Sequence, residues 1–165
     1  MIFRGRVWKF ASNVDTDVII PIQYCKITDP KELAKHCMEG IVPAFHEKVN
    51  PGDVIIAGDN FGCGSSREPA PISIKATGIS CIIAKSFARI FYRNAFNVGL
   101  PILECLEALE SIEEGHEVEV NFDTGEIRHL FRGRSFRAKP VPLFMQELVF
   151  DGGLMNHLKK KLSNS

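Results

Sequence analysis

The sequence lacks the features that mark several specialised classes of protein. Its 20 basic and 20 acidic residues cancel, so bulk charge gives no reason to expect a nucleic acid or a membrane surface as partner. No apolar run approaches the length of a membrane-spanning helix, and the alternating start MIFRGRVWKF is unlike a secretory signal. With 45% hydrophobic residues in 165, the composition predicts one cytoplasmic domain spanning residues 1–165.

The cysteines also lack the spacing of a metal site or a disulfide framework. Five are scattered along the chain, at 25, 37, 63, 81 and 105, and no two form a C-x-x-C pair. Reduced thiols are therefore expected. An iron–sulfur cluster needs several converging thiolates, so the sequence predicts that this chain alone binds no metal and no cofactor. Asp15 and Asp17 make a poor metal site without further oxygen ligands, and capping of a turn is the expected role.

Short apolar runs alternate with helical patterns in the middle of the chain. DVIIAG, SCIIAK and PILEC are typical of buried strands, with helices expected at about 71–77 and over 86–97. This alternation predicts an α/β fold with a mostly parallel core sheet. Before it, the patterns predict a strand over 2–10, a long loop over 13–30 and a helix over 30–40.

The pattern changes after residue 105. A hairpin turning at 123–125 and a further strand in RGRSFRAKPV predict an antiparallel extension of the sheet. Flanking helices are expected near 142–149 and 153–161, and KKKLSNS is expected to be a frayed tail.

The glycine–serine loop, GDNFGCGSSREPAP at residues 58–71, follows a predicted strand and precedes a predicted helix. Ligands of open α/β sheets bind at this edge, where helix N-termini present free N–H groups. Gly62 and Gly64 allow a positive φ and close approach of the backbone, and Arg67 offers a fork that suits a carboxylate. The alternative is a helix cap, because Ser65 and Glu68 have the spacing of a capping box. The residues alone leave an anion-binding loop and a cap about equally supported.

Four ordered motifs give the chain a family resemblance. NVDTDVIIP (13–21), DPKELAKHCMEG (29–40), the glycine–serine loop and SFARIFYRNAFNVGLPILEC (86–105) resemble the swivelling β/β/α domain of the aconitase superfamily. The resemblance is to the form in which this domain is a separate small subunit, as in isopropylmalate isomerases and homoaconitases. The family usually has histidine where this chain has Pro69, which leaves the start of the following helix open.

The resemblance implies a divided active site. In the family a separate large subunit carries a 4Fe–4S cluster, and the two chains assemble as a heterodimer or heterotetramer. The substrate is a small 2-hydroxy dicarboxylate or tricarboxylate, which is dehydrated and rehydrated at the neighbouring carbon. Ser65 matches the base that removes the carbon-bound proton, and Ser66, Arg67 and Gly64 match positions that bind substrate carboxylate. A non-catalytic carboxylate-binding domain is the alternative from another class.

Family members choose substrates partly through the segment after IIP. The specificity loop of this chain is Tyr24, Cys25, Lys26 and Ile27. An inward Lys26 would favour a third carboxylate, as in homoaconitase, whereas a solvated Lys26 would leave Tyr24 and Ile27 to form an apolar pocket for an alkyl group. The second arrangement is favoured, and with it isopropylmalate as substrate; a homoaconitase-type or a 2,3-dimethylmalate substrate is the alternative.

Other residues have weaker assignments. Arg89, Arg93 and Asn94 form one helix face that is either solvated or, by the family resemblance, close to the active site, where Asp17 is also expected. Cys63 has no adjacent histidine and is expected to pack rather than react.

Overall fold

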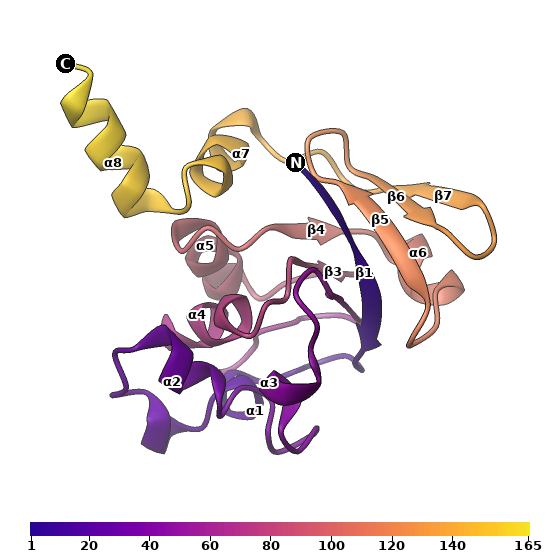
Figure 1. The fold of residues 1–165 in the computed structure, drawn as a ribbon, viewed down its shortest axis with the longest axis horizontal. Helices are drawn as coiled ribbons and strands as arrows, with labels where there is room; N and C mark the ends of the chain where they lie inside the picture. Colours follow the sequence, from indigo (N-terminus) through magenta and orange to yellow (C-terminus); the bar gives the residue numbers. More distant parts are fainter.

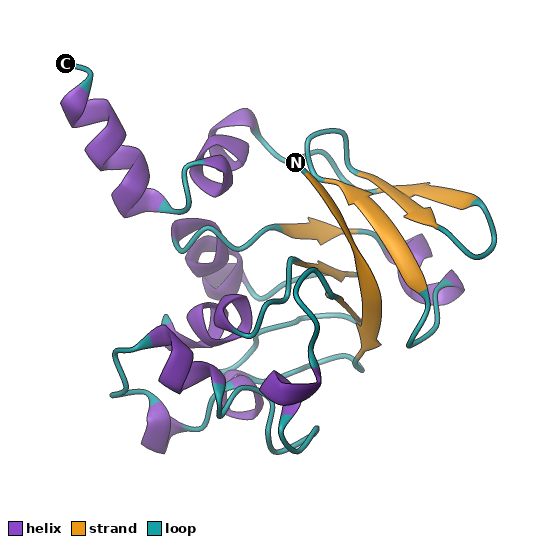
Figure 2. Cartoon of the chain, in the orientation of Figure 1, coloured by secondary structure: helices purple, strands orange, loops and turns teal.

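The computed structural model describes residues 1–165 and contains one seven-stranded sheet in the order β4-β3-β2-β1-β5-β6-β7. The strands are β1 (Ile2–Lys9), β2 (Val54–Ala57), β3 (Cys81–Ala84), β4 (Ile102–Glu104), β5 (Glu117–Asn121), β6 (Glu126–His129) and β7 (Arg134–Arg137). Figure 2 shows most of the helices gathered on one side of the strands.

The sheet has a parallel half and an antiparallel half that share β1. Strands β1 to β4 are parallel neighbours, whereas β5 pairs antiparallel with β1 and continues through β6 to β7. Every residue of β2 and β3 is buried, as expected for strands covered on both faces. The predicted α/β fold, with a mostly parallel core, flanking helices and an antiparallel extension, is confirmed.

Helices connect and flank the strands (Figure 1). They are α1 (Thr16–Ile19), the 3-10 turn η1 (Ile22–Tyr24), α2 (Pro30–Ala34), α3 (Phe45–Lys48), α4 (Pro69–Ala76), α5 (Arg89–Asn97), α6 (Leu106–Ser111), α7 (Leu143–Phe150) and α8 (Leu154–Ser163). Figure 1 shows α8 extending away from the body of the molecule. No helix is long and apolar enough to cross a bilayer.

Three expectations about local structure were wrong. The loop predicted over 13–30 contains α1 and η1, because the Asp15 side chain caps a short helix there. The helix predicted over 30–40 ends at Ala34, since Met38 adopts a left-handed φ of 57° and its amide donates to the Ile19 carbonyl at 2.9 Å. The expected frayed tail is helical as far as Ser163.

A hydrophobic cluster of 39 buried residues runs through the molecule. Asp53 is one of the few polar side chains in the interior, with only 3% of its surface exposed. Its carboxylate accepts hydrogen bonds from the Arg6 amide at 3.2 Å, the Trp8 indole at 3.0 Å and the Asn50 amide at 2.9 Å. These bonds satisfy the buried charge and tie the start of β2 to β1.

Candidate functional site

The site lies where the segments that follow β1, β2 and β3 meet, at the carboxyl ends of parallel strands. The segment after β1 lies along the glycine–serine loop, because the Asn13 amide donates to the Asp59 carbonyl at 2.7 Å and the Gly62 amide to the Val14 carbonyl at 2.8 Å. The segment after β3 joins them through a bridge between Phe61 and Phe87. This is the edge at which open α/β sheets bind their ligands.

Glycine is required at two points of the loop by close packing. Gly62 has a φ of +83°, and a Cβ there would lie 2.2 Å from the Phe91 ring on α5. Gly64 has a φ of +95°, and a Cβ there would lie 2.7 to 2.9 Å from the Asp15 carboxylate. Side chains rarely adopt this backbone conformation. The two glycines therefore let the loop turn between α5 and the segment after β1.

Ser65 and Ser66 are exposed at the tip of the loop. Neither hydroxyl makes a hydrogen bond within the chain, but the Thr16 hydroxyl donates to the Ser65 carbonyl at 3.0 Å and anchors the backbone. The serine side chains thus stand on open surface with an anchored backbone behind them.

The capping-box alternative for Ser65 and Glu68 is wrong. Helix α4 begins at Pro69 with Glu68 as its N-cap residue, and no side chain caps it. Proline suits the first helical position because that position needs no N–H donor, so Pro69 gives α4 a regular start. The amides of residues 63–68 donate to no acceptor within the chain. A run of unused N–H groups before a helix is the arrangement that binds anions.

Within the Ser65-Ser66-Arg67 triplet, only the Arg67 side chain makes polar contacts with the rest of the chain. Its Nη1 donates to the Ile20 carbonyl at 3.2 Å and forms an ion pair with Asp17. Only 11% of the Arg67 side chain is exposed, against 63% of the Asp17 side chain. The guanidinium is therefore held against the protein, with Asp17 on its solvent side.

The two acidic residues of the 13–21 segment have different roles. Asp15 caps α1, as expected, and its Oδ1 accepts from the Asp17 amide at 2.7 Å. Asp17 lies beside Arg67, and its place close to an active site stays a prediction. Sequence reasoning missed Thr16, whose buried hydroxyl anchors Ser65; its position within the DTD triplet was the available signal.

The cysteines offer no metal-binding cluster. No group of three or more His, Cys, Asp or Glu side chains lies close enough to hold a metal ion. Burial raises the pKa of Cys37 and of Cys81 to about 12. Burial and the nearby Asp15 carboxylate raise the pKa of Cys63, which disfavours its reactive thiolate form. The donor set of this chain does not fit an iron–sulfur cluster.

The specificity loop is partly packed against the body of the protein. The Tyr24 ring stacks on His36 with centroids 3.6 Å apart, and Ile27 packs against the core. The Cys25 thiol is 3.7 Å from the Pro21 carbonyl, and Lys26 is exposed with no ion pair. The Lys26 side chain is thus exposed to solvent, as the favoured arrangement predicted.

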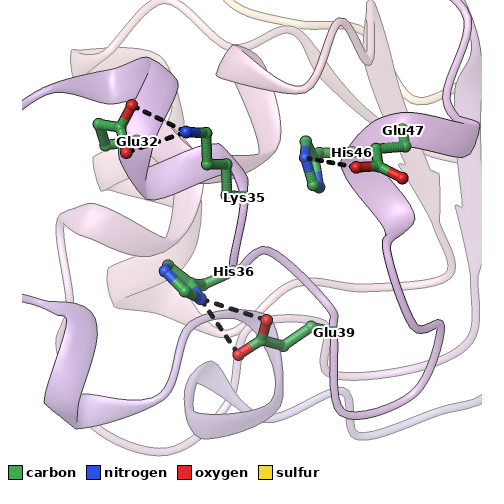
Figure 3. Close-up of polar contacts among 6 residues, drawn as sticks. All are labelled: Glu32, Lys35, His36, Glu39, His46 and Glu47. Atoms are coloured by element: carbon green, nitrogen blue, oxygen red, sulfur yellow. Dashed lines mark hydrogen bonds and ion pairs between the residues drawn. The ribbon is translucent and has the colours of Figure 1, made fainter.

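His36 was missed by sequence reasoning. Figure 3 shows its Nδ1 directed at both carboxylate oxygens of Glu39, at 3.3 and 3.2 Å. The same figure shows the ion pair between Glu32 and Lys35, which lies nearby and shares no residue with this contact. Glu39 thereby orients the ring on which Tyr24 stacks. The only sequence signal for this contact was the i, i+3 spacing of His36 and Glu39 within the 29–40 motif.

Helix α5 begins beside the site, since the Ala88 amide donates to the Phe61 carbonyl at 2.9 Å. Arg89 and Arg93 are exposed and form no ion pair, and Asn94 is half-buried. The structure places Arg89 at the first turn of the helix, next to the loop. A contact of these residues with the site stays a prediction.

Comparisons with known proteins all relate this chain to the aconitase family. The model of the aconitase C-terminal domain family matches residues 43–108. The 3-isopropylmalate dehydratase small subunit of Caldicellulosiruptor bescii is 58% identical over 162 residues, which cover 98% of each chain. The 2,3-dimethylmalate dehydratase small subunit of Eubacterium barkeri is 61% identical over 155 residues, which cover 94% of this chain and 95% of the other.

A crystal structure of 3-isopropylmalate dehydratase from Methanocaldococcus jannaschii has the same fold. The two structures match with a TM-score of 0.91 and 50% sequence identity, over 98% of this chain and 95% of the other. The similarity in sequence and in structure thus extends over nearly the whole chain, including the segments that build the site.

Proposed function

This chain belongs to the family of aconitase-type dehydratase small subunits, and we propose that it is the small subunit of a 3-isopropylmalate dehydratase. The enzyme is a hydro-lyase that isomerises 2-isopropylmalate to 3-isopropylmalate in leucine biosynthesis. The observation that carries the proposal is 58% identity over 98% of both chains, together with an intact Ser65-Ser66-Arg67 triplet on the exposed loop. Residues 1–165 act in this proposal as one cytoplasmic domain.

The active site is proposed to be completed by a large subunit, as the name "small subunit" of the relatives implies. The 4Fe–4S cluster belongs to that subunit in this proposal, since no donor cluster of this chain suits it; when bound, it supplies the Lewis acid that accepts the substrate hydroxyl. The exposed Ser65 and Ser66 face open surface, as residues do when a second chain must close over them. The subunits would pair as a heterodimer or heterotetramer.

Ser65 Oγ is proposed to remove the proton from the substrate carbon and to return it during rehydration. A neutral serine is a weak base, so its anionic form needs stabilisation by nearby dipoles and charges. The unused amides of residues 63–68 supply such dipoles, and the Arg67 guanidinium supplies a positive charge close by. The bond from Thr16 to the Ser65 carbonyl fixes the backbone without occupying the hydroxyl.

Ser66, Arg67 and the Gly64 amide are proposed to bind a substrate carboxylate. The Ser66 hydroxyl and the Gly64 N–H have no partner within the chain, so both can donate to a ligand. Arg67 adds charge-assisted hydrogen bonds, which are stronger than neutral ones. A dicarboxylate held at one end would present its reacting carbons to Ser65.

A dimethylmalate-type substrate is the second candidate, because the 2,3-dimethylmalate dehydratase small subunit is 61% identical to this chain. Both candidate substrates carry an alkyl group where a homoaconitase substrate carries a third carboxylate. The exposed, unpaired Lys26 favours the alkyl substrates, because a cation in water binds a carboxylate weakly.

The test is reconstitution of the chain with a cluster-bearing large subunit under anaerobic conditions. Turnover of 2-isopropylmalate, 2,3-dimethylmalate and homocitrate is then compared. Ser65→Ala is expected to lower kcat by about 10³-fold, as loss of a general base does. Ser135→Ala, at an exposed serine of β7 whose hydroxyl makes no hydrogen bond within the chain, is the matched control.

Two outcomes would contradict the proposal. Binding of the substrates without turnover, in a complex with an intact cluster, would identify a non-catalytic carboxylate-binding domain. A Ser65→Ala complex within threefold of the wild-type rate would remove Ser65 from the role of base.

A further inference from the structure

Only one of the three guanidinium nitrogens of Arg67 makes a polar contact within the chain. Nη1 donates to the Ile20 carbonyl at 3.2 Å, and the same Nη1 forms the ion pair with Asp17. Nε and Nη2 make no hydrogen bond within the chain. The Nε–Nη2 edge of the planar guanidinium is therefore unused. This edge can donate two parallel hydrogen bonds to one carboxylate.

The unused edge is not fully buried. Polar side-chain atoms that are fully buried without a partner occur only in His46, His129 and His157. Arg67 Nε and Nη2 are unpaired and absent from that set, so neither atom is fully buried, although only 11% of the side chain is exposed. The Nε–Nη2 edge therefore keeps two donors that Asp17, paired with Nη1, does not occupy.

Asp17 is itself held in place by its neighbours. Its amide donates to Asp15 Oδ1 at 2.7 Å, and the absence of a side chain at Gly64 leaves room for that Asp15 carboxylate. The chain of contacts runs from Gly64 through Asp15 and Asp17 to Arg67. It joins two segments that are about fifty positions apart in sequence and holds Nη1 of the guanidinium.

We propose that Asp17 is a positioning residue that holds Arg67 Nη1, so that the Nε–Nη2 edge receives a substrate carboxylate in bidentate fashion. The proposal rests on the dehydratase function above and adds which edge of Arg67 binds and what orients it. Asp17 and the substrate use different nitrogens, so Asp17 assists binding rather than competing with it. Preorganisation of this kind lowers the ordering cost that binding has to overcome.

The test compares variants of the small subunit in the reconstituted anaerobic complex. Asp17→Asn is expected to raise KM for 2-isopropylmalate about 10-fold with kcat within twofold, because it weakens binding equally in the ground and transition states. Arg67→Lys is expected to raise KM about 100-fold, since lysine keeps the charge but lacks the two-nitrogen edge. Asp29→Asn is the control: Asp29 caps α2 and makes no contact with Arg67.

The double variant separates positioning from general destabilisation. In the Arg67→Lys background, Asp17→Asn is expected to raise KM by less than twofold, because there is no fork left to orient. Independent effects that multiply to about 1,000-fold would overturn the proposal. So would a lower KM in Asp17→Asn, which would make Asp17 a competitor, or an equal effect of Asp29→Asn.

A spectroscopic readout keeps this proposal separate from the proposed function. In ¹⁵N-labelled small subunit alone, the Arg67 guanidinium is expected to show slow rotation about its Cζ–N bonds, and Asp17→Asn is expected to accelerate it. Fast rotation in the wild-type chain would overturn the positioning role whatever the activity. A wild-type complex that turns over none of the substrates would instead refute the dehydratase function, and with it the carboxylate assignment.

Discussion

Replacing Gly64 by alanine is expected to destabilise the chain and to disturb the site at the same time. A residue with a side chain at the φ of +95° found here costs about 1–2 kcal/mol in backbone strain. The new Cβ would also lie 2.7 to 2.9 Å from the Asp15 carboxylate, which must move and give up its bond to the Asp17 amide, at a cost of about 1 kcal/mol. The free energy of unfolding is therefore expected to fall by about 2–3 kcal/mol.

The assay is urea unfolding of the isolated chain, with two glycines as matched controls. Gly115 has a φ of +86°, but no atom lies within 4 Å of the position that a Cβ would take there, so Gly115→Ala reports backbone strain alone. Gly40 has neither the positive φ nor a close neighbour, so Gly40→Ala is expected to leave stability almost unchanged. Equal losses for Gly64→Ala and Gly115→Ala would refute the role of the Asp15 contact. In the complex, Gly64→Ala is also expected to raise KM.

Two further predictions concern the interior. Asp53→Ala is expected to lower the free energy of unfolding by about 3 kcal/mol, because three donors lose their acceptor; a urea midpoint within error of wild type would contradict this. Burial and nearby basic side chains lower the pKa of His129, so the unfolded state binds more protons just below pH 6.5. Stability contributed by neutral His129 is therefore complete above about pH 6.5 and is lost as pH falls towards its folded pKa. Unfolding curves from pH 5 to 8 should show this loss in the wild type and a smaller one in His129→Phe.

The main strands were predictable because their signal is local. Segments such as DVIIAG and SCIIAK are continuous apolar runs bounded by turn residues, and burial on both faces of a parallel sheet demands that pattern. The helices α1, α3 and α6 have four to six residues, too few to show an amphipathic repeat. Helix α3 even starts after Ala44 in a left-handed conformation, for which its sequence gives no signal.

The residue types of the site were predictable, but their mutual contacts were not. Gly64, Ser65 and Arg67 stand together in one segment with a recognisable composition. The pairing of Arg67 with Asp17, and of Tyr24 with His36, depends on how separate segments pack. The predicted apolar pocket of Tyr24 and Ile27 depends on the same kind of packing, which leaves both side chains half-buried against the protein. Long-range packing of this kind has no periodicity in sequence.

The two edges of the sheet bear on whether copies of this chain can pair with one another. An open edge strand is a template for pairing with another copy of the same protein. At one edge, β7 places exposed Arg134 and Arg137, and facing copies would bring like charges together. At the other edge, β4 has only three residues, and the Lys139 amide already donates to the Glu104 carbonyl at 2.9 Å. Both edges thus disfavour pairing between copies of this chain, and the glycine–serine loop belongs to neither edge.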